Sequence, residues 1–187
     1  TQKNEQTAWG MVNAEKAVKE AGAVKTKPST PENPSTPVTK PASVGYQTHV
    51  QNIGWQGEVR DGVSGGTEGK SLRVEAFKVR LISQPYSGGI QVQSHVQNIG
   101  WQNWVSNGAI SGTSGRGFRV EALRIRLTGE MANKYDVYYR THCQNVGWTG
   151  WAKNGASCGT SGYAYRMEAV QIKLVKKGSP APGPATG

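Results

Sequence analysis

Hydrophobic and polar residues alternate along two kinds of stretch in this chain, and strict alternation predicts half-buried strands. In the stretch 92–97, Val and Ser at even positions alternate with Gln and His at odd positions. In the stretch 119–127, one face carries Arg119, Glu121, Leu123, Ile125 and Leu127, and the other carries Val120, Ala122, Arg124 and Arg126. We predict that the face with the leucines points inward, which would take Arg119 and Glu121 with it.

Both stretches belong to a unit that occurs three times. Each copy opens on a His-x-Gln-x-x-Gly-Trp motif, and the tryptophans lie 46 and then 47 residues apart. A Gly-Thr pair and an Arg-x-Glu-Ala motif follow at fixed distances. Fixed spacing of this kind indicates one supersecondary unit used three times. The shared residues are His49, His95 and His142, Gln51, Gln97 and Gln144, Trp55, Trp101 and Trp148, Arg73, Arg119 and Arg166, and Glu75, Glu121 and Glu168.

Several short strands per repeat and the lack of a helix signal predict a closed all-β domain with pseudo-threefold symmetry. A β-prism is favoured over a β-trefoil. The repeats span 45–83, 90–128 and 135–175, with hairpin-like turns expected at 85–89 and 129–134. Many glycines and few Leu and Phe residues agree with turn-rich β structure.

The remaining segments differ in composition. Residues 1–22 predict a short helix, capped by Asn13 and stopped by Gly22, that belongs to an upstream domain. Residues 23–44 have a proline every three or four positions and predict an extended linker. Residues 45–175 form the repeat domain, and residues 176–187 form a Pro/Gly-rich tail that is typical of a second linker.

The repeated motifs resemble the ChW repeat, the clostridial hydrophobic repeat with a conserved tryptophan. The resemblance covers residues 46–174 and implies an extracellular module of Gram-positive bacteria that acts in adhesion or in carbohydrate or cell-surface binding. Residues 8–22 also resemble the closing segment of subtilisin-like serine peptidase domains, which would place a catalytic domain upstream. The Asp, His and Ser motifs of such peptidases do not occur here, so this fragment is not expected to be an enzyme.

The charged residues of the repeat are interpreted as structural. Charges on an inward face are costly unless paired, so we predict one Arg–Glu pair per repeat, extended by the His and Gln of the neighbouring strand. General acid/base catalysis by Glu121 would need a second, suitably placed carboxylate, and none repeats. Three equivalent His residues could meet as a metal site, but hydrogen-bonded structural roles are favoured. We therefore expect no metal and no cofactor.

The tryptophans provide the candidate ligand site. Trp55, Trp101 and Trp148 could be core or ligand platform, and core is favoured. A second tryptophan follows in two repeats only, at Trp104 and Trp151, and Glu58 takes this position in the first repeat. A position that accepts Glu belongs at the surface, where an indole can stack on a sugar while amides bond its hydroxyls. The glycan-binding candidates are Trp104, Trp151, Asn103, Asn107 and Asn154.

Cys143 and Cys158, both in the third repeat, could form a disulfide between a strand and the Gly-rich loop, or remain two buried thiols. The net charge of +10 is scattered over linkers and strands, which disfavours nucleic acid as a partner. No apolar run is long enough to span a membrane. The expected protein is a monomeric module, secreted or on the cell surface, whose partner is a glycan or cell-surface polymer. The alternatives are protein–protein adhesion and binding of a polyanion.

Overall fold

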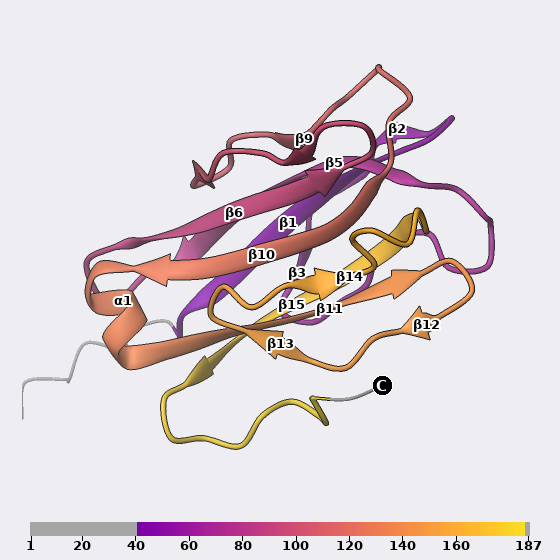
Figure 1. The fold of residues 1–187 in the computed structure, drawn as a ribbon. Coiled ribbons are helices and arrows are strands. Elements are labelled where there is room, and N and C mark those ends of the chain that lie inside the picture. Colours follow the sequence, from indigo (N-terminus) through magenta and orange to yellow (C-terminus); the bar gives the residue numbers. More distant parts are fainter. Residues whose placement is uncertain (1–40, 186–187) are drawn as a thin grey trace, which may run out of the picture. The chain divides into compact units, whose positions relative to one another are not determined.

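The computed structural model describes residues 41–185, and these fold into three antiparallel β-sheets with one short helix (Figure 1). The expected helix in residues 1–22 and nearly all of the expected linker lie outside the described residues. The predicted all-β domain of three repeats is confirmed, and each sheet has five strands.

Each repeat supplies one long hairpin and three strands of two residues. The hairpins pair β1 (Ser43–Val50) with β5 (Val74–Ser83), β6 (Gly89–Val96) with β10 (Val120–Thr128), and β11 (Tyr135–Cys143) with β15 (Met167–Lys176). The short strands are β2 (Gly54–Trp55), β3 (Val59–Arg60), β4 (Gly65–Gly66), β7 (Gly100–Trp101), β8 (Val105–Ser106), β9 (Ser111–Gly112), β12 (Gly147–Trp148), β13 (Ala152–Lys153) and β14 (Cys158–Gly159).

The turn expected at 129–134 is instead the helix α1 (Gly129–Lys134). Its Met131 is fully buried, and its main chain is held by a hydrogen bond from the Met131 N–H to the carbonyl of Ser87, at 2.9 Å. Glu130, Met131, Ala132 and Lys134 are good helix formers, a signal that the turn prediction overlooked. Burial of the Met131 side chain against the core stabilises this short connection as a helix.

The three repeats exchange strands around a closed ring. Strand β9 of the second repeat pairs with β5 of the first, β14 of the third pairs with β10 of the second, and β4 of the first pairs with β15 of the third. Each repeat therefore completes the sheet of the one before it, and the first completes that of the last. The ring ties residues more than 100 positions apart, since Gly66 pairs with Ala169.

The core lies between the three sheets and is built from the inward side chains of the long hairpins. Phe77, Leu123, Ile125 and Ile172 are fully buried there. The predicted apolar face is correct from Leu123 onward but wrong at the start of the strand. Val120 pairs with Val96 while Ala122 pairs with His95, so a β-bulge lies at Glu121.

The bulge reverses the alternation of faces. Val120 is fully buried in the core cluster, although regular alternation placed it outside. The Arg119 side chain is 21% exposed rather than inward, and Glu121 lies buried between core and surface with 6% of its side chain exposed. Val74 and Met167 are the buried equivalents of Val120 in the other repeats.

Candidate functional site

A chain of four side chains runs through each repeat, from Arg to Glu to His to Trp. In the second repeat, Nε and Nη2 of Arg119 donate to Oε1 of Glu121 at 2.9 and 2.8 Å. The other oxygen of Glu121 lies 3.1 Å from Nδ1 of His95. The His95 ring packs edge-on against Trp101, with centroids 5.3 Å apart. The first and third repeats have the same arrangement.

This geometry confirms the predicted Arg–Glu pair in every repeat and its extension by His. In the third repeat, Nδ1 of His142 is hydrogen-bonded to the second oxygen of Glu168 at 3.1 Å, so both oxygens of this buried carboxylate have partners. In the first two repeats, Nδ1 of His49 and of His95 lies at ion-pair distance from its glutamate but makes no hydrogen bond within the described residues. The glutamines that were expected to join the pair do so through the backbone only: the N–H of Gln97 donates to the carbonyl of Arg119 at 3.0 Å. The His residues therefore position the first tryptophan, a link that sequence reasoning did not find.

Trp55, Trp101 and Trp148 are half-buried at the surface rather than in the core, which corrects the preferred prediction for them. A cation lies over each indole: Lys78 at 4.4 Å from the Trp55 centroid, Arg124 at 4.0 Å from Trp101, and Arg140 at 4.8 Å from Trp148. The cations come from the outward faces of the long strands. Cation–π contacts of this kind fix the indole in place.

The second tryptophan position is also at the surface, as predicted. Trp104 is half-buried beneath Arg126, with 4.2 Å between the guanidinium carbon and the ring centroid. At the same position of the first repeat, Glu58 instead accepts two hydrogen bonds from Arg80, at 2.7 and 3.0 Å. The Arg80 guanidinium holds the pKa of the Glu58 carboxyl below its usual value. An arginine at 80 or 126 can thus partner either residue type.

A groove of about 460 Å³ lies beside Trp101 in the second repeat. Trp101, Asn103 and Ile110 line it, and Ile110 is 46% exposed. Asn103 is exposed, so its amide faces solvent at the rim. Trp104 packs against Arg126 and is not among the residues that line this groove. The indole of Trp101 and the exposed amide of Asn103 therefore meet at one open groove, whereas Arg124 and Arg126 contact the indoles outside its lining.

Two of the predicted site residues serve the turns instead. The side-chain oxygen of Asn107 accepts a hydrogen bond from the N–H of Ile90, and that of Asn154 accepts one from the N–H of Val137, both at 3.0 Å. Both residues have positive φ, 39° and 49°, as Asp61 does at the equivalent position. Their oxygens are taken up by the fold, so Asn103 is the better amide candidate.

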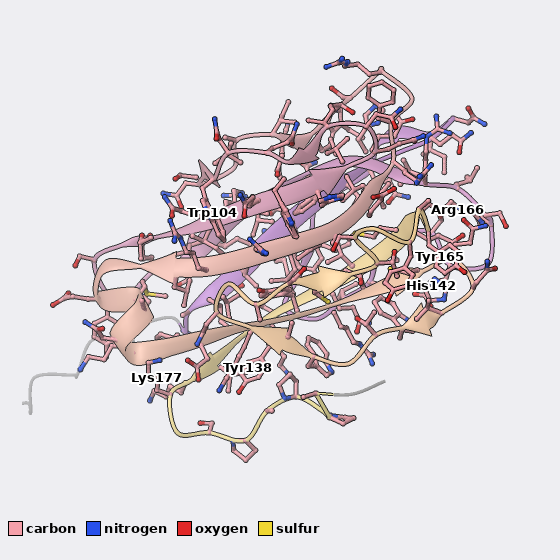
Figure 2. All side chains as sticks on the ribbon, in the orientation of Figure 1. Trp104, Tyr138, His142, Tyr165, Arg166 and Lys177 are labelled. Atoms are coloured by element: carbon pink, nitrogen blue, oxygen red, sulfur yellow. The ribbon has the colours of Figure 1, made fainter. Side chains whose placement is uncertain are left out.

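The Trp151 face differs from the Trp104 face because the tail of the chain lies on it. The main-chain N–H of Trp151 donates a hydrogen bond to the carbonyl of Pro184 at 2.9 Å. A Cβ on Gly183 would lie 2.9 Å from the indole Cδ1 and Nε1 atoms. The tail, yellow in Figure 1, follows Lys177 and runs below Tyr138 in Figure 2. Residues 183–184 therefore dock on a predicted ligand platform.

Cys143 and Cys158 are free thiols, so the disulfide that the sequence allowed is not formed. Both sulfurs are buried and approach the Thr141 hydroxyl, at 3.4 and 3.7 Å. Burial raises the pKa of both thiols. Cys158 lies on β14, which pairs with β10 of the second repeat, and its sulfur also lies 3.8 Å from the carbonyl oxygen of Tyr139 on β11.

Within residues 41–185, no cluster of three or more His, Cys, Asp or Glu side chains is arranged to hold a metal ion. The three histidines contact their own glutamates instead of one another. The described residues also contain no helix of the length and hydrophobicity that a bilayer crossing requires.

Comparison with known families decides the relationship. The family model described as Clostridial hydrophobic W, or ChW, matches residues 49–83, 95–129 and 142–176, more than half of the chain. The chain belongs to the ChW family. The resemblance drawn from the motifs is confirmed, and ChW is a non-catalytic repeat module. Searches among curated proteins and among solved structures found no match. The similarity of residues 8–22 to subtilisin-like peptidases stays a prediction.

Proposed function

We propose that this ChW domain is a non-catalytic extracellular module that binds glycan of the cell wall or of another surface polymer. The binding face is the outward side of the second repeat, where Trp101 and Asn103 line the open groove and Trp104 packs against Arg126. The observation that carries the proposal is the pair of indoles held by Arg124 and Arg126, one of which, Trp101, lines that groove. Fixed indoles lose little conformational entropy when a sugar ring stacks on them.

The guanidinium groups above the indoles bear on the kind of glycan. Arg126 is exposed, and its Nε donates to the side-chain oxygen of Gln91 at 2.9 Å, so its plane is held while its other N–H groups face outward. Such donors suit hydroxyl, carboxylate or phosphate substituents on a sugar. The second repeat is the main site, because the first has Glu58 in place of a tryptophan and the third is covered by the tail.

In its parent protein, this module would attach a secreted enzyme to the polymer that it binds. The resemblance of residues 8–22 to the end of a subtilisin-like domain supports a serine peptidase as that enzyme. The Pro-rich composition of residues 23–44 supports a spacer between the two. The linkage would raise the local concentration of the enzyme at the polymer surface.

Co-sedimentation of residues 1–187 with purified Gram-positive cell walls and with insoluble polysaccharides tests the binding proposal. The variant Trp104→Ala should lose most of the binding at low salt and at high salt. The matched control is Trp55→Ala in the first repeat, where the platform is incomplete. Equal binding by wild type and Trp104→Ala would reject the proposed face, and binding that disappears with salt in every variant would indicate general charge attraction.

A further inference from the structure

A second pocket lies at one end of the domain and takes no part in the proposed glycan site. Its volume is about 390 Å³, and each repeat contributes one glutamine, one small residue and one arginine to its lining: Gln51, Ser71 and Arg73, Gln97, Gly117 and Arg119, and Gln144, Ala164 and Arg166. Because the three sets are equivalent, the pocket lies on the pseudo-threefold axis. Figure 2 shows Arg166, with His142 and Tyr165, at the end of the body away from α1.

The three arginines keep donors free for a ligand. In each, Nε and Nη2 bind the glutamate two residues on, with N–O distances between 2.7 and 3.0 Å. Both N–H groups point to Oε1 of the glutamate, so the contact uses one edge of the guanidinium plane and leaves Nη1 with two N–H groups. In the described part of the chain, these three guanidinium groups have no other hydrogen bond, and the side chains of Gln51, Gln97 and Gln144 have none.

The backbone is shaped to leave space between the donors. Ser71, Gly117 and Ala164 all have left-handed backbone, with φ of 55°, 72° and 58°. For Ser and Ala this conformation costs on the order of 1 kcal/mol each, and strain of this kind is found at binding sites. A Cβ on Gly117 would lie 3.4 Å from Nη2 of Arg73, so the guanidinium of one repeat reaches the small residue of the next.

The charges that face solvent here are positive. The side chains of Arg73, Arg119 and Arg166 are 21–25% exposed, whereas their glutamate partners are 6% exposed and lie behind them. Lys70 and Arg116 are exposed and directly precede two of the lining residues. The nearby Glu68 has its carboxylate engaged by Trp148 Nε1, at 3.2 Å, and by the Ser64 hydroxyl, at 2.8 Å.

We propose that this axial pocket is an anion site that binds one phosphate or sulfate group. Each repeat would give the oxyanion one guanidinium arm, and the three glutamine amides would complete the donor set. A tetrahedral oxyanion presents three oxygens around an axis, which matches three equivalent donors. Arginine forks are the side chains best suited to such oxygens. The group could be a free ion or an ester on a polymer, and the site does not depend on the glycan proposal.

Calorimetric titration of the full chain with inorganic phosphate and with sulfate, at low ionic strength, tests the site. We expect one anion per chain and a shift of the Nε–H resonances of the three arginines in NMR spectra. Gln97→Glu adds a carboxylate to the pocket without removing an Arg–Glu pair, and should weaken phosphate binding by about tenfold or more. The control is Asn133→Asp, which adds the same charge at an exposed residue of α1, at the other end of the domain. It should change the phosphate affinity little.

A second blocking variant, Ser71→Asp, protects the test against a folding failure of Gln97→Glu, because Asp tolerates left-handed backbone. A poly(glycerol phosphate) chain that binds more tightly than free phosphate, and is lost in both variants, would identify the polymer as the source. Equal affinity would identify the free ion. Absence of anion binding to the wild type, or equal binding by both variants and wild type, would overturn the proposal. Trp104→Ala should leave phosphate affinity unchanged, which separates this site from the glycan face.

Discussion

Gly112 of the second repeat lies directly against the main chain of Glu75 in the first, and the N–H of the next residue, Thr113, donates to the Glu75 carbonyl at 2.8 Å. The same contact joins Gly159 to Glu121 and Gly66 to Glu168. These three contacts close the strand-exchange ring. They give the Gly-Thr pair of the motif a physical reason, because any side chain at the glycine would collide with backbone.

Gly112→Ala should therefore destabilise the domain by at least about 2 kcal/mol, since a Cβ would meet the Glu75 carbonyl oxygen and the backbone has a φ of 103°. Gly115→Ala is the matched control. Its φ is 74°, but nothing lies within 4 Å of the added Cβ, so only the conformational cost of about 1 kcal/mol remains. Urea unfolding of both variants measures the difference. Equal losses would show that the close approach of the two chains is unimportant.

The sequence predicted the repeats, the long strands and the Arg–Glu pairs, because each of these follows from spacing or alternation within one unit. It could not predict which repeat each short strand pairs with. The three copies have the same pattern, and this pattern is equally compatible with pairing inside one repeat and with pairing between adjacent repeats. The bulge at Glu121 was missed for a related reason. Alternation assumes a regular ladder, whereas the bulge depends on the pairing of Val120 with Val96 across the hairpin.

The candidate site shows the same division. Glu58 at the position of Trp104 indicated a place at or near the surface, and the structure places both residues there, half-buried. Asn107 and Asn154 were assigned to the ligand, but each is followed by Gly, and Asn-Gly is a strong turn signal. That signal could have identified their role. The convergence of three arginines on one pocket could not be read from the chain, because it depends on the symmetry of the closed ring.

Replacing Glu58 with tryptophan should create a further indole platform. Arg80 occupies the position equivalent to Arg126, whose guanidinium lies over the Trp104 ring, and it would form a cation–π contact in place of its ion pair. We expect Glu58→Trp to bind cell walls more strongly than wild type in the co-sedimentation assay, by several-fold through avidity. Glu58→Leu controls for the lost charge and the added apolar surface. If the Leu variant gained as much as the Trp variant, the indole would not be the cause.

Removal of residues 179–187 should uncover Trp151. The Pro184 carbonyl now accepts its backbone N–H, and Gly183 lies against its ring. The shortened chain should show red-shifted tryptophan fluorescence and increased wall binding. The increase should be abolished by Trp151→Ala made in the shortened chain, and it should be unaffected by Trp55→Ala. Unchanged fluorescence after the truncation would mean that the tail does not cover the indole in solution.

Alkaline pH should unfold the domain through two buried tyrosines. Burial raises the pKa of Tyr46 and of Tyr139 from 10.0 to about 12. Each hydroxyl donates to a main-chain carbonyl, of Val63 and of Ala156 respectively. A raised pKa in the folded state leaves stability intact below pH 10. Between pH 10 and 12 the unfolded chain ionises first, so stability falls by up to about 3 kcal/mol per tyrosine. Denaturant unfolding at a series of pH values measures the loss, which should be smaller in Tyr139→Phe. If the free energy of unfolding fell by the same amount in Tyr139→Phe and in wild type, the loss would come from groups other than Tyr139.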